Sequence, residues 1–143
     1  MSLRSQFLTA ALAVMLSVAA CAPDNGPVLD APQALALMQS GKLTLIDIRR
    51  PEEWRETGVA VGAVRISMAD AEGTAGFVRQ VEAQLGGDRN APVGLIGRSG
   101  SRSGRMQKAL LDAGFTQVYN IREGMAGSGA GPGWIARGLP VEP

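Results

Sequence analysis

Hydrophobic residues alternate along the chain between two kinds of pattern, short continuous runs and longer repeats at helical spacing. Three runs have the near-continuous pattern of strands buried on both faces of a sheet. They are Leu43–Ile48, Pro92–Ile96 and Val118–Ile121. The helices predicted from the repeats are Ala31–Gln39, Thr74–Leu85 and a segment before Gly114 with the apolar stripe Met106, Ala109, Leu110 and Ala113. This alternation predicts one α/β domain, with a central parallel sheet and helices on both of its faces.

The start of the chain has a different pattern, typical of an export signal. Arg4 precedes the uncharged, mainly apolar run Phe7–Ala20. The run is too short for a helix that spans a membrane, which needs roughly 20 residues, but it suits a signal peptide. It ends in Val18-Ala19-Ala20-Cys21, which resembles the lipobox of bacterial lipoproteins, whose Cys is lipidated and becomes the new N-terminus. An ordinary signal peptide that happens to end beside a Cys is the alternative.

These patterns predict three segments: a signal peptide at residues 1–20, a lipidated tether at residues 21–27 and a folded domain at residues 28–142. Lipidation of Cys21 would anchor the domain to a bacterial membrane without spanning it. The domain would face the periplasm. We favour the outer membrane because Ala22, rather than an Asp, follows the Cys.

Composition excludes several kinds of chemistry. The 143 residues include 14 Lys and Arg, 13 Asp and Glu, one Cys and no His. Catalysis by His is therefore excluded, as are an internal disulfide and a zinc site of thiolates and imidazoles. We expect no metal and no cofactor. The near-zero net charge argues against a nucleic-acid partner, because such proteins need a large basic surface.

The segment Gly97-Arg98-Ser99-Gly100-Ser101-Arg102-Ser103 follows the second predicted strand and leads into a helix. Its two glycines allow the backbone to curl so that successive N–H groups converge, and a helix N-terminus adds its dipole. Arg105 and Lys108 bring the basic side chains between positions 98 and 108 to four, with no acidic residue among them. The pattern favours an anion-binding loop. A flexible turn with a solvated basic face is the alternative.

The same segment resembles the active-site loop of rhodanese-like sulfurtransferases, C-R-x-G-x-R-S, except that Gly97 stands in place of the Cys. Shorter matches flank it in the family's order, and together they extend from about Val28 to Glu142. Upstream they are Asp47-Ile48-Arg49, Glu53-Trp54, Gly58 and Gly62-Ala63. Val59-Ala60 departs from the His-Ile of many members. Downstream they are Ala109-Leu110, Gly114-Phe115, Val118-Tyr119, Gly124, Trp134 and Gly138-Leu139-Pro140.

The resemblance implies covalent catalysis, in which a loop Cys thiolate accepts sulfur as a persulfide and passes it to a thiophile. Gly97 carries no thiol, and Cys21 would lie at the end of a tether and be acylated on its own sulfur. We therefore expect no catalytic residue in this chain and no thiosulfate:cyanide sulfurtransferase activity.

Binding by the loop does not require the missing thiol. We expect residues 97–103 to bind a small anion, such as thiosulfate, sulfate or phosphate, or an acidic side chain of a partner protein. Two alternatives stay open. A partner could supply the thiol in trans for sulfur transfer, or the domain could be a purely structural adaptor lipoprotein.

A few further residues have two readings. Asp47 and Arg49 could lie at the rim of the pocket. Alternatively, Asp47 is buried and bonds loop amides, with Arg49 paired to Glu53 or Asp47, and this structural role is favoured. Trp54 and Trp134 are expected to fill the edge of the core rather than to mark a recognition surface. The glycine-rich segment Gly124–Gly133 could be a mobile flap over the pocket or a permissive linker.

Overall fold

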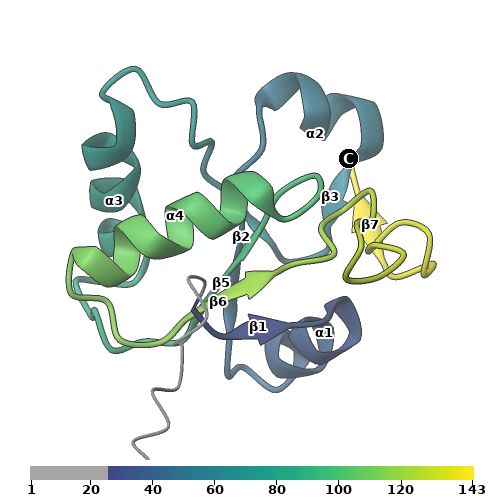
Figure 1. Cartoon of the computed structure of the whole chain (residues 1–143), viewed down its shortest axis with the longest axis horizontal. Helices are drawn as coiled ribbons and strands as arrows, with labels where there is room; N and C mark the ends of the chain where they lie inside the picture. Colours follow the sequence, from purple (N-terminus) through teal and green to yellow (C-terminus); the bar gives the residue numbers. More distant parts are fainter. Residues whose placement is uncertain (1–25) are drawn as a thin grey trace, which may run out of the picture.

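The computed structural model describes residues 26–143, which form a parallel sheet flanked by helices (Figure 1). In chain order the elements are β1 (Val28–Leu29), α1 (Ala31–Gln39), β2 (Thr44–Asp47), α2 (Pro51–Thr57), β3 (Val59–Ala60), β4 (Val64–Arg65), α3 (Gly73–Gln84), β5 (Val93–Ile96), α4 (Ser101–Asp112), β6 (Val118–Ile121) and β7 (Val141–Glu142). The five strands of the main sheet have the order β1-β6-β5-β2-β4. All neighbours in it are parallel, so the predicted fold class is confirmed.

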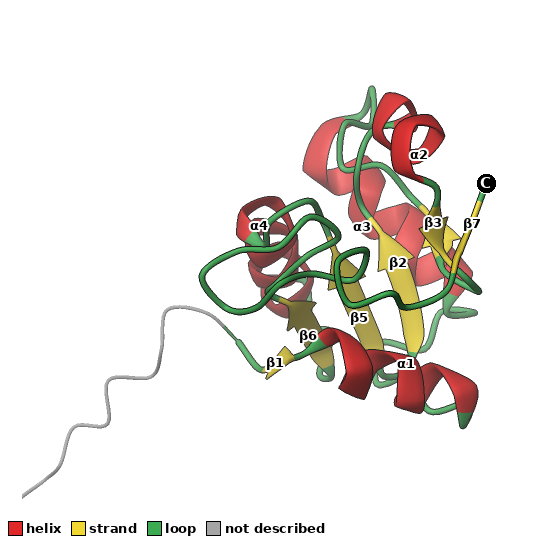
Figure 2. Cartoon of the chain, turned by 90° about the vertical axis from the view of Figure 1, so that its right-hand side faces the viewer, coloured by secondary structure: helices red, strands yellow, loops and turns green. Residues whose placement is uncertain are grey.

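Helices cover both faces of this sheet, as Figure 2 shows. Residues of α3 and α4, such as Phe77 and Leu110, pack against Ile46 and Leu95 on one face. The other face is covered by α1 and by the C-terminal segment that contains Trp134. Side chains alternate between the faces because successive residues of a strand point in opposite directions. Because both faces are covered, residues on both sides of a central strand are buried, and this explains why the predicted strands are continuous apolar runs.

Local signals explain where α1 begins and ends. The Asp30 carboxylate accepts a hydrogen bond from the Gln33 backbone N–H at 2.7 Å, and the Gln33 side chain accepts one from the Asp30 backbone at 2.9 Å. This capping box satisfies two backbone donors that the first turn leaves unpaired. Gly41 follows the helix with a φ of 71°, a conformation that suits glycine. The helix has the bounds predicted from the sequence.

Other boundaries differ from the predictions. The helix α4 begins at Ser101, so Ser101, Arg102 and Ser103 belong to its first turn and not to the loop before it. The sequence of Pro51–Glu56 predicts one short helical turn, and the structure has the seven-residue helix Pro51–Thr57 there. The two-residue strands β1, β3 and β7 were not predicted, because a hydrophobic pattern needs about four residues to be recognisable.

The predicted signal peptide, the lipidated Cys21 and nearly all of the predicted tether lie outside the described residues. Within residues 26–143, no helix is long and apolar enough to cross a membrane. The same part of the chain holds no group of three or more His, Cys, Asp or Glu side chains placed to bind a metal ion.

Candidate functional site: the β5–α4 loop

The β5–α4 loop, residues 97–100, leaves the carboxyl end of β5 and enters α4, where ligands commonly bind in parallel α/β sheets. Gly97 is buried, and its φ is not positive, so its backbone conformation is open to other residues. A Cβ atom at this position would lie 3.3 Å from Ile48 Cδ1 and 3.6 Å from both the backbone N and Oγ of Ser103. Position 97 therefore faces the first turn of α4.

Backbone N–H groups of this region are free. Those of residues 99–103 donate to no acceptor found within residues 26–143. The loop carbonyls, in contrast, are engaged: Gly97 O accepts from Met125 N–H at 2.9 Å and Arg98 O accepts from Ala126 N–H at 2.9 Å. The carbonyl oxygens of Gly97, Arg98 and Gly100 are thus occupied, while the N–H donors remain available together with the N-terminal dipole of α4.

Ser103 stabilises the loop with its side chain. The Ser103 hydroxyl is buried and lies 2.7 Å from Asn120 Oδ1 and 3.2 Å from Gly100 O. Asn120, on β6, also donates from Nδ2 to Gly100 O at 3.2 Å. Of the residues expected to bind a ligand, Ser103 can therefore offer its backbone N–H but not its side chain.

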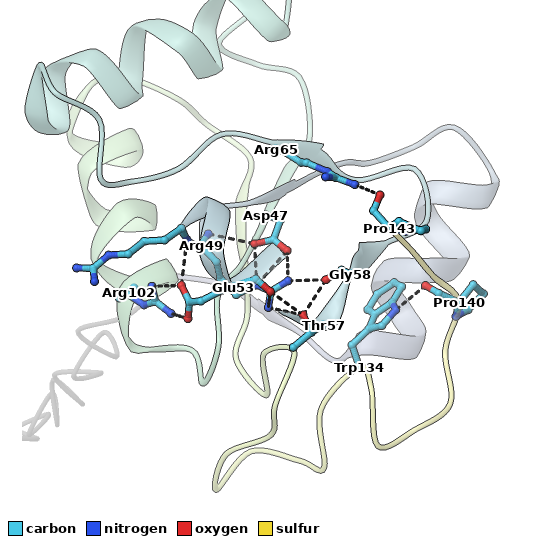
Figure 3. A network of polar contacts seen from close by, with 11 residues as sticks. Asp47, Arg49, Glu53, Thr57, Gly58, Arg65, Arg102, Trp134, Pro140 and Pro143 are labelled. Carbon is cyan, nitrogen blue, oxygen red and sulfur yellow. Dashed lines mark hydrogen bonds and ion pairs between the residues drawn. The ribbon is translucent and has the colours of Figure 1, made fainter. Parts of the chain in front are cut away.

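Arg102 is paired with an acidic residue of α2. Its Nη1 and Nη2 atoms lie 2.8 and 2.6 Å from the two carboxylate oxygens of Glu53, which makes a bidentate ion pair (Figure 3). The hydrogen bonds from Arg102 lower the pKa of the Glu53 carboxyl to about 2, although partial burial opposes the shift. The sequence had suggested Glu53 as a partner for Arg49 instead. Arg102 therefore holds α4 to α2, and its charge is already neutralised.

Asp47 and Arg49 are buried and line neither hollow beside the loop, so they do not form a rim. Arg49 is 2% exposed, and its Nη2 lies 2.8 Å from Asp47 Oδ2 and 2.9 Å from Gly58 O. Its Nη1 donates to Thr57 Oγ1 at 2.8 Å (Figure 3). The prediction that these residues lie at the rim is therefore wrong. A buried guanidinium needs partners for its donors, and that of Arg49 finds them at the ends of β2 and α2. The buried pair is the reading that the structure bears out.

The glycine-rich segment after β6 is fixed against the loop. It provides the Met125 and Ala126 amides that bind the loop carbonyls. At its start, Glu123 is 1% exposed and accepts from Arg137 Nε at 2.5 Å and from Gly133 N–H at 3.1 Å. Burial raises the pKa of Glu123, but these hydrogen bonds outweigh burial and lower it overall. The first part of the segment, Met125 and Ala126, therefore supports the loop from behind.

Both tryptophans lie against the body of the fold. Trp134 is fully buried, and its Nε1 donates to Pro140 O at 2.9 Å, so it belongs to the core as predicted. Trp54 on α2 is only partly buried, although its Nε1 is buried and finds no acceptor within residues 26–143. The sequence analysis did not predict the structural roles of Asn120 and Glu123. Their only signal in the sequence is that each is a polar residue within or just after an apolar strand.

Two hollows lie on either side of the loop, and Ser99 borders both. The α2-side hollow, of about 590 Å³, is lined by Arg50, Glu52, Glu53, Arg98, Ser99 and Arg102. The α4-side hollow, of about 540 Å³, is lined by residues of α4, by Arg122 after β6 and by the turn 128–130. Of the loop residues predicted from the sequence, Arg98 and Arg102 line the α2-side hollow, Gly100 and Ser101 line the α4-side hollow, and Ser99 lines both. The buried Gly97 and Ser103 line neither hollow.

Comparison with known proteins agrees with this geometry. A family model described as "Rhodanese-like domain" matches residues 30–129. That range extends from the start of α1 to the turn after β6 and includes the β5–α4 loop. The chain therefore belongs to the rhodanese-like domain family.

Individual relatives span several bacteria. The uncharacterized protein YibN of Escherichia coli is 26% identical over 114 residues, which are 80% of this chain and 71% of YibN. The structure of Rv0390 from M. tuberculosis is 30% identical, has a TM-score of 0.64 and is matched over 82% of this chain and 98% of that one. The polysulfide-sulfur transferase homodimer from Wolinella succinogenes is 27% identical, with a TM-score of 0.63, over 83% and 79% of the two chains.

Proposed function

We propose that this protein is an exported, membrane-anchored rhodanese-like domain that binds an anion or an acidic partner and does not transfer sulfur. One observation carries the proposal: position 97, at the carboxyl end of β5 and opposite the free Ser103 N–H, is a glycine. In the family pattern this position holds the Cys nucleophile. Without a thiolate there, the chain has no atom within the loop on which a persulfide can form.

The remaining groups of the loop support binding. The backbone donors of residues 99–103 and the dipole of α4 favour a negative charge near position 97 whether or not a thiol is present. The ligand class is a small oxyanion such as thiosulfate, sulfate or phosphate, or a carboxylate of a partner protein. Among these ligands, similarity to the structure of thiosulfate sulfurtransferase from Pseudomonas aeruginosa favours a sulfur oxyanion.

A sulfurtransferase assay with Gly97→Cys tests the proposal. We expect no thiosulfate:cyanide turnover from the purified chain, and measurable turnover from the variant. The atom nearest to the new Cβ is Ile48 Cδ1, at 3.3 Å. Because it is the end of a flexible side chain, the Gly97→Cys substitution should be tolerated. Gly97→Ser, which adds a similar side chain without sulfur, is the control and should stay inactive. Turnover by the unmodified chain that survives removal of contaminating thiols would refute the proposal.

Two other functions remain candidates, and a thermal-shift titration separates them from anion binding. A single-site ligand at a hundredfold excess over its Kd stabilises a protein by about 2.7 kcal/mol. We expect thiosulfate, sulfate or phosphate to raise the Tm. A flat response across millimolar anions would favour a structural adaptor. Turnover that appears only when a partner protein with a reactive thiol is added would favour sulfur transfer in trans.

The location has its own test. We propose that Cys21 is lipidated and holds the domain at the periplasmic side of a bacterial membrane, with the outer membrane favoured. Cys21→Ser should move the protein from the membrane fraction to the soluble periplasmic fraction. Equal partitioning of both forms would refute the anchor, and recovery of the unmodified protein in inner-membrane fractions would refute the choice of membrane.

A further inference from the structure

We infer that the α4-side hollow is a second ligand site, which binds the phosphate ester of a hydroxylated, non-aromatic molecule. This site lies on the opposite side of the β5–α4 loop from the Glu53–Arg102 pair. It does not depend on what occupies position 97, so it goes beyond the proposed function and can stand or fall separately.

Charge distinguishes the two hollows. In the α2-side hollow, Glu53 neutralises Arg102, and Glu52 offsets one of the two other arginines, Arg50 and Arg98. The cations of the α4-side hollow are Arg105, Lys108 and Arg122, and no Asp or Glu of the described residues lines it. The excess of positive charge is therefore larger in the α4-side hollow, which no carboxylate of the described residues lines.

Two of these three cations have no partner elsewhere in the fold. The exposed side chains of Arg105 and Arg122 make no hydrogen bond or ion pair within residues 26–143. Lys108 pairs with Asp112 at 2.8 Å, but both side chains are about two-thirds exposed, and such pairs contribute little to stability. Lys108 can thus turn to a ligand at small cost. Together the cations suit a phosphomonoester dianion or a bisphosphate.

The fold brings the cations together from two elements. Ser101, Arg105 and Lys108 are spaced by four and three residues, which places them on one face of α4. Arg122 reaches the same hollow from the end of β6. The Ser128 hydroxyl donates to the Arg122 backbone carbonyl at 2.9 Å and fixes the turn 128–130 as the third wall. The site is therefore built on a helix, a strand end and a tied turn.

Size and lining define the rest of the ligand. The volume of about 540 Å³ is in the range of small-molecule sites and exceeds what a bare phosphate would fill. Ser99, Ser101 and Ser128 are among the residues that line it, and no aromatic residue of the described part of the chain does. Without an aromatic surface for stacking, a nucleobase has no platform, whereas a polyol can hydrogen-bond to the serines. A sugar phosphate and a phosphoinositide headgroup share this chemistry.

The site can be tested by calorimetric titration of the full chain with fructose bisphosphate, glycerol phosphate and, as the uncharged control, fructose. We expect both phosphates to bind and fructose not to bind. The double variant Arg105→Ala/Arg122→Ala should weaken the binding of fructose bisphosphate about tenfold or more. Because both side chains are exposed, the double variant should keep the wild-type Tm, which confirms that it folds.

A matched control removes two exposed arginines, Arg50 at the start of α2 and Arg55 within it, neither of which lines the α4-side hollow. Arg50→Ala/Arg55→Ala changes the charge of the chain equally, and it should leave phosphate-ester affinity within about twofold of wild type. Loss of binding in this control but not in the Arg105/Arg122 variant would overturn the inference. So would the absence of binding by either soluble phosphate and by a short-chain, water-soluble phosphatidylinositol phosphate. Binding of that lipid alone, dependent on Arg105 and Arg122, would assign a membrane headgroup as the source.

Discussion

The bidentate ion pair between Glu53 and Arg102 gives Arg102 a structural role, although the motif suggests that it binds a ligand. Arg102 occupies a position of the anion-loop pattern, yet both of its terminal nitrogens bind Glu53. The sequence could not reveal this pairing, because the two residues are 49 positions apart and on different helices. In contrast, the clustering of residues 97–103 was predictable, since they are consecutive. The burial of Ser103 depends on Asn120, another distant residue.

This pair should contribute to stability in a pH-dependent way. The pKa of Glu53 is lowered from 4.5 to about 2, so its contribution is fully present above pH 4.5 and is lost as the pH falls through about 2. Glu53→Gln should lower the free energy of unfolding at neutral pH by about 2 kcal/mol, as expected for charge-assisted hydrogen bonds. Urea unfolding at several pH values would measure both effects.

The variant should also lose less stability than wild type between pH 5 and pH 2, because the titrating carboxylate is gone. Glu82→Gln is a suitable control, since Glu82 also pairs with an arginine, Arg89, but that pair is more exposed. Parallel loss of stability in wild type and Glu53→Gln over this range would contradict the assignment of the low pKa to Glu53.

At the scale of elements, long patterns were readable and short ones were not. The helix α1 and the strands β2, β5 and β6 follow from capping residues and continuous apolar runs. The start of α4 was displaced by about one turn, because a segment of Gly, Ser and Arg has no hydrophobic period to follow. Its true start depends on Gly100, whose φ of 93° is strongly disfavoured for other residues.

Gly100 should therefore be hard to replace. A Cβ at this position would overlap the backbone carbonyl of Arg122, in addition to the strain of a positive φ. We expect Gly100→Ala to lower the free energy of unfolding by more than about 2 kcal/mol. Gly41→Ala is the matched control, because Gly41 has a φ of 71° but no atom within 4 Å of the added Cβ. Gly41→Ala should lower the free energy of unfolding by only about 1 kcal/mol.

Urea unfolding of the two alanine variants measures the difference. If both variants lose the same stability, the close approach of the loop to Arg122 does not constrain position 100. A larger loss at Gly100 would show that the turn into α4 is fixed by the strand end beside it, and not by glycine flexibility alone.

At the scale of the molecule, a single sheet joins two hydrophobic clusters. Leu110 lies in the cluster under α3 and α4, and Trp134 lies in the cluster on the opposite face. Since both clusters pack on the same strands, the domain should unfold as one unit. The general architecture was predictable from the alternation of elements, whereas the antiparallel pair of β3 and β7 joins segments too short and too distant to foresee.

Leu110→Ala tests this coupling. The loss of a fully buried Leu should cost about 2–5 kcal/mol. In a Trp54→Phe background, fluorescence reports Trp134 alone, on the other face of the sheet. We expect the fluorescence transition in urea to move to lower urea by the same amount as the circular dichroism transition. Separate midpoints for the two signals would show that the faces unfold independently.

The hydrogen bonds that Met125 and Ala126 donate to the loop have a consequence for how such a protein can change over time. Because the curve of the loop is imposed from a distant part of the chain, the residue at its first position does not have to maintain it. Codons for glycine and cysteine can differ by a single base. A lineage that carries this backbone can thus pass between a reactive and an inert form without redesigning its surroundings, and sequences of either kind should be found on the same scaffold.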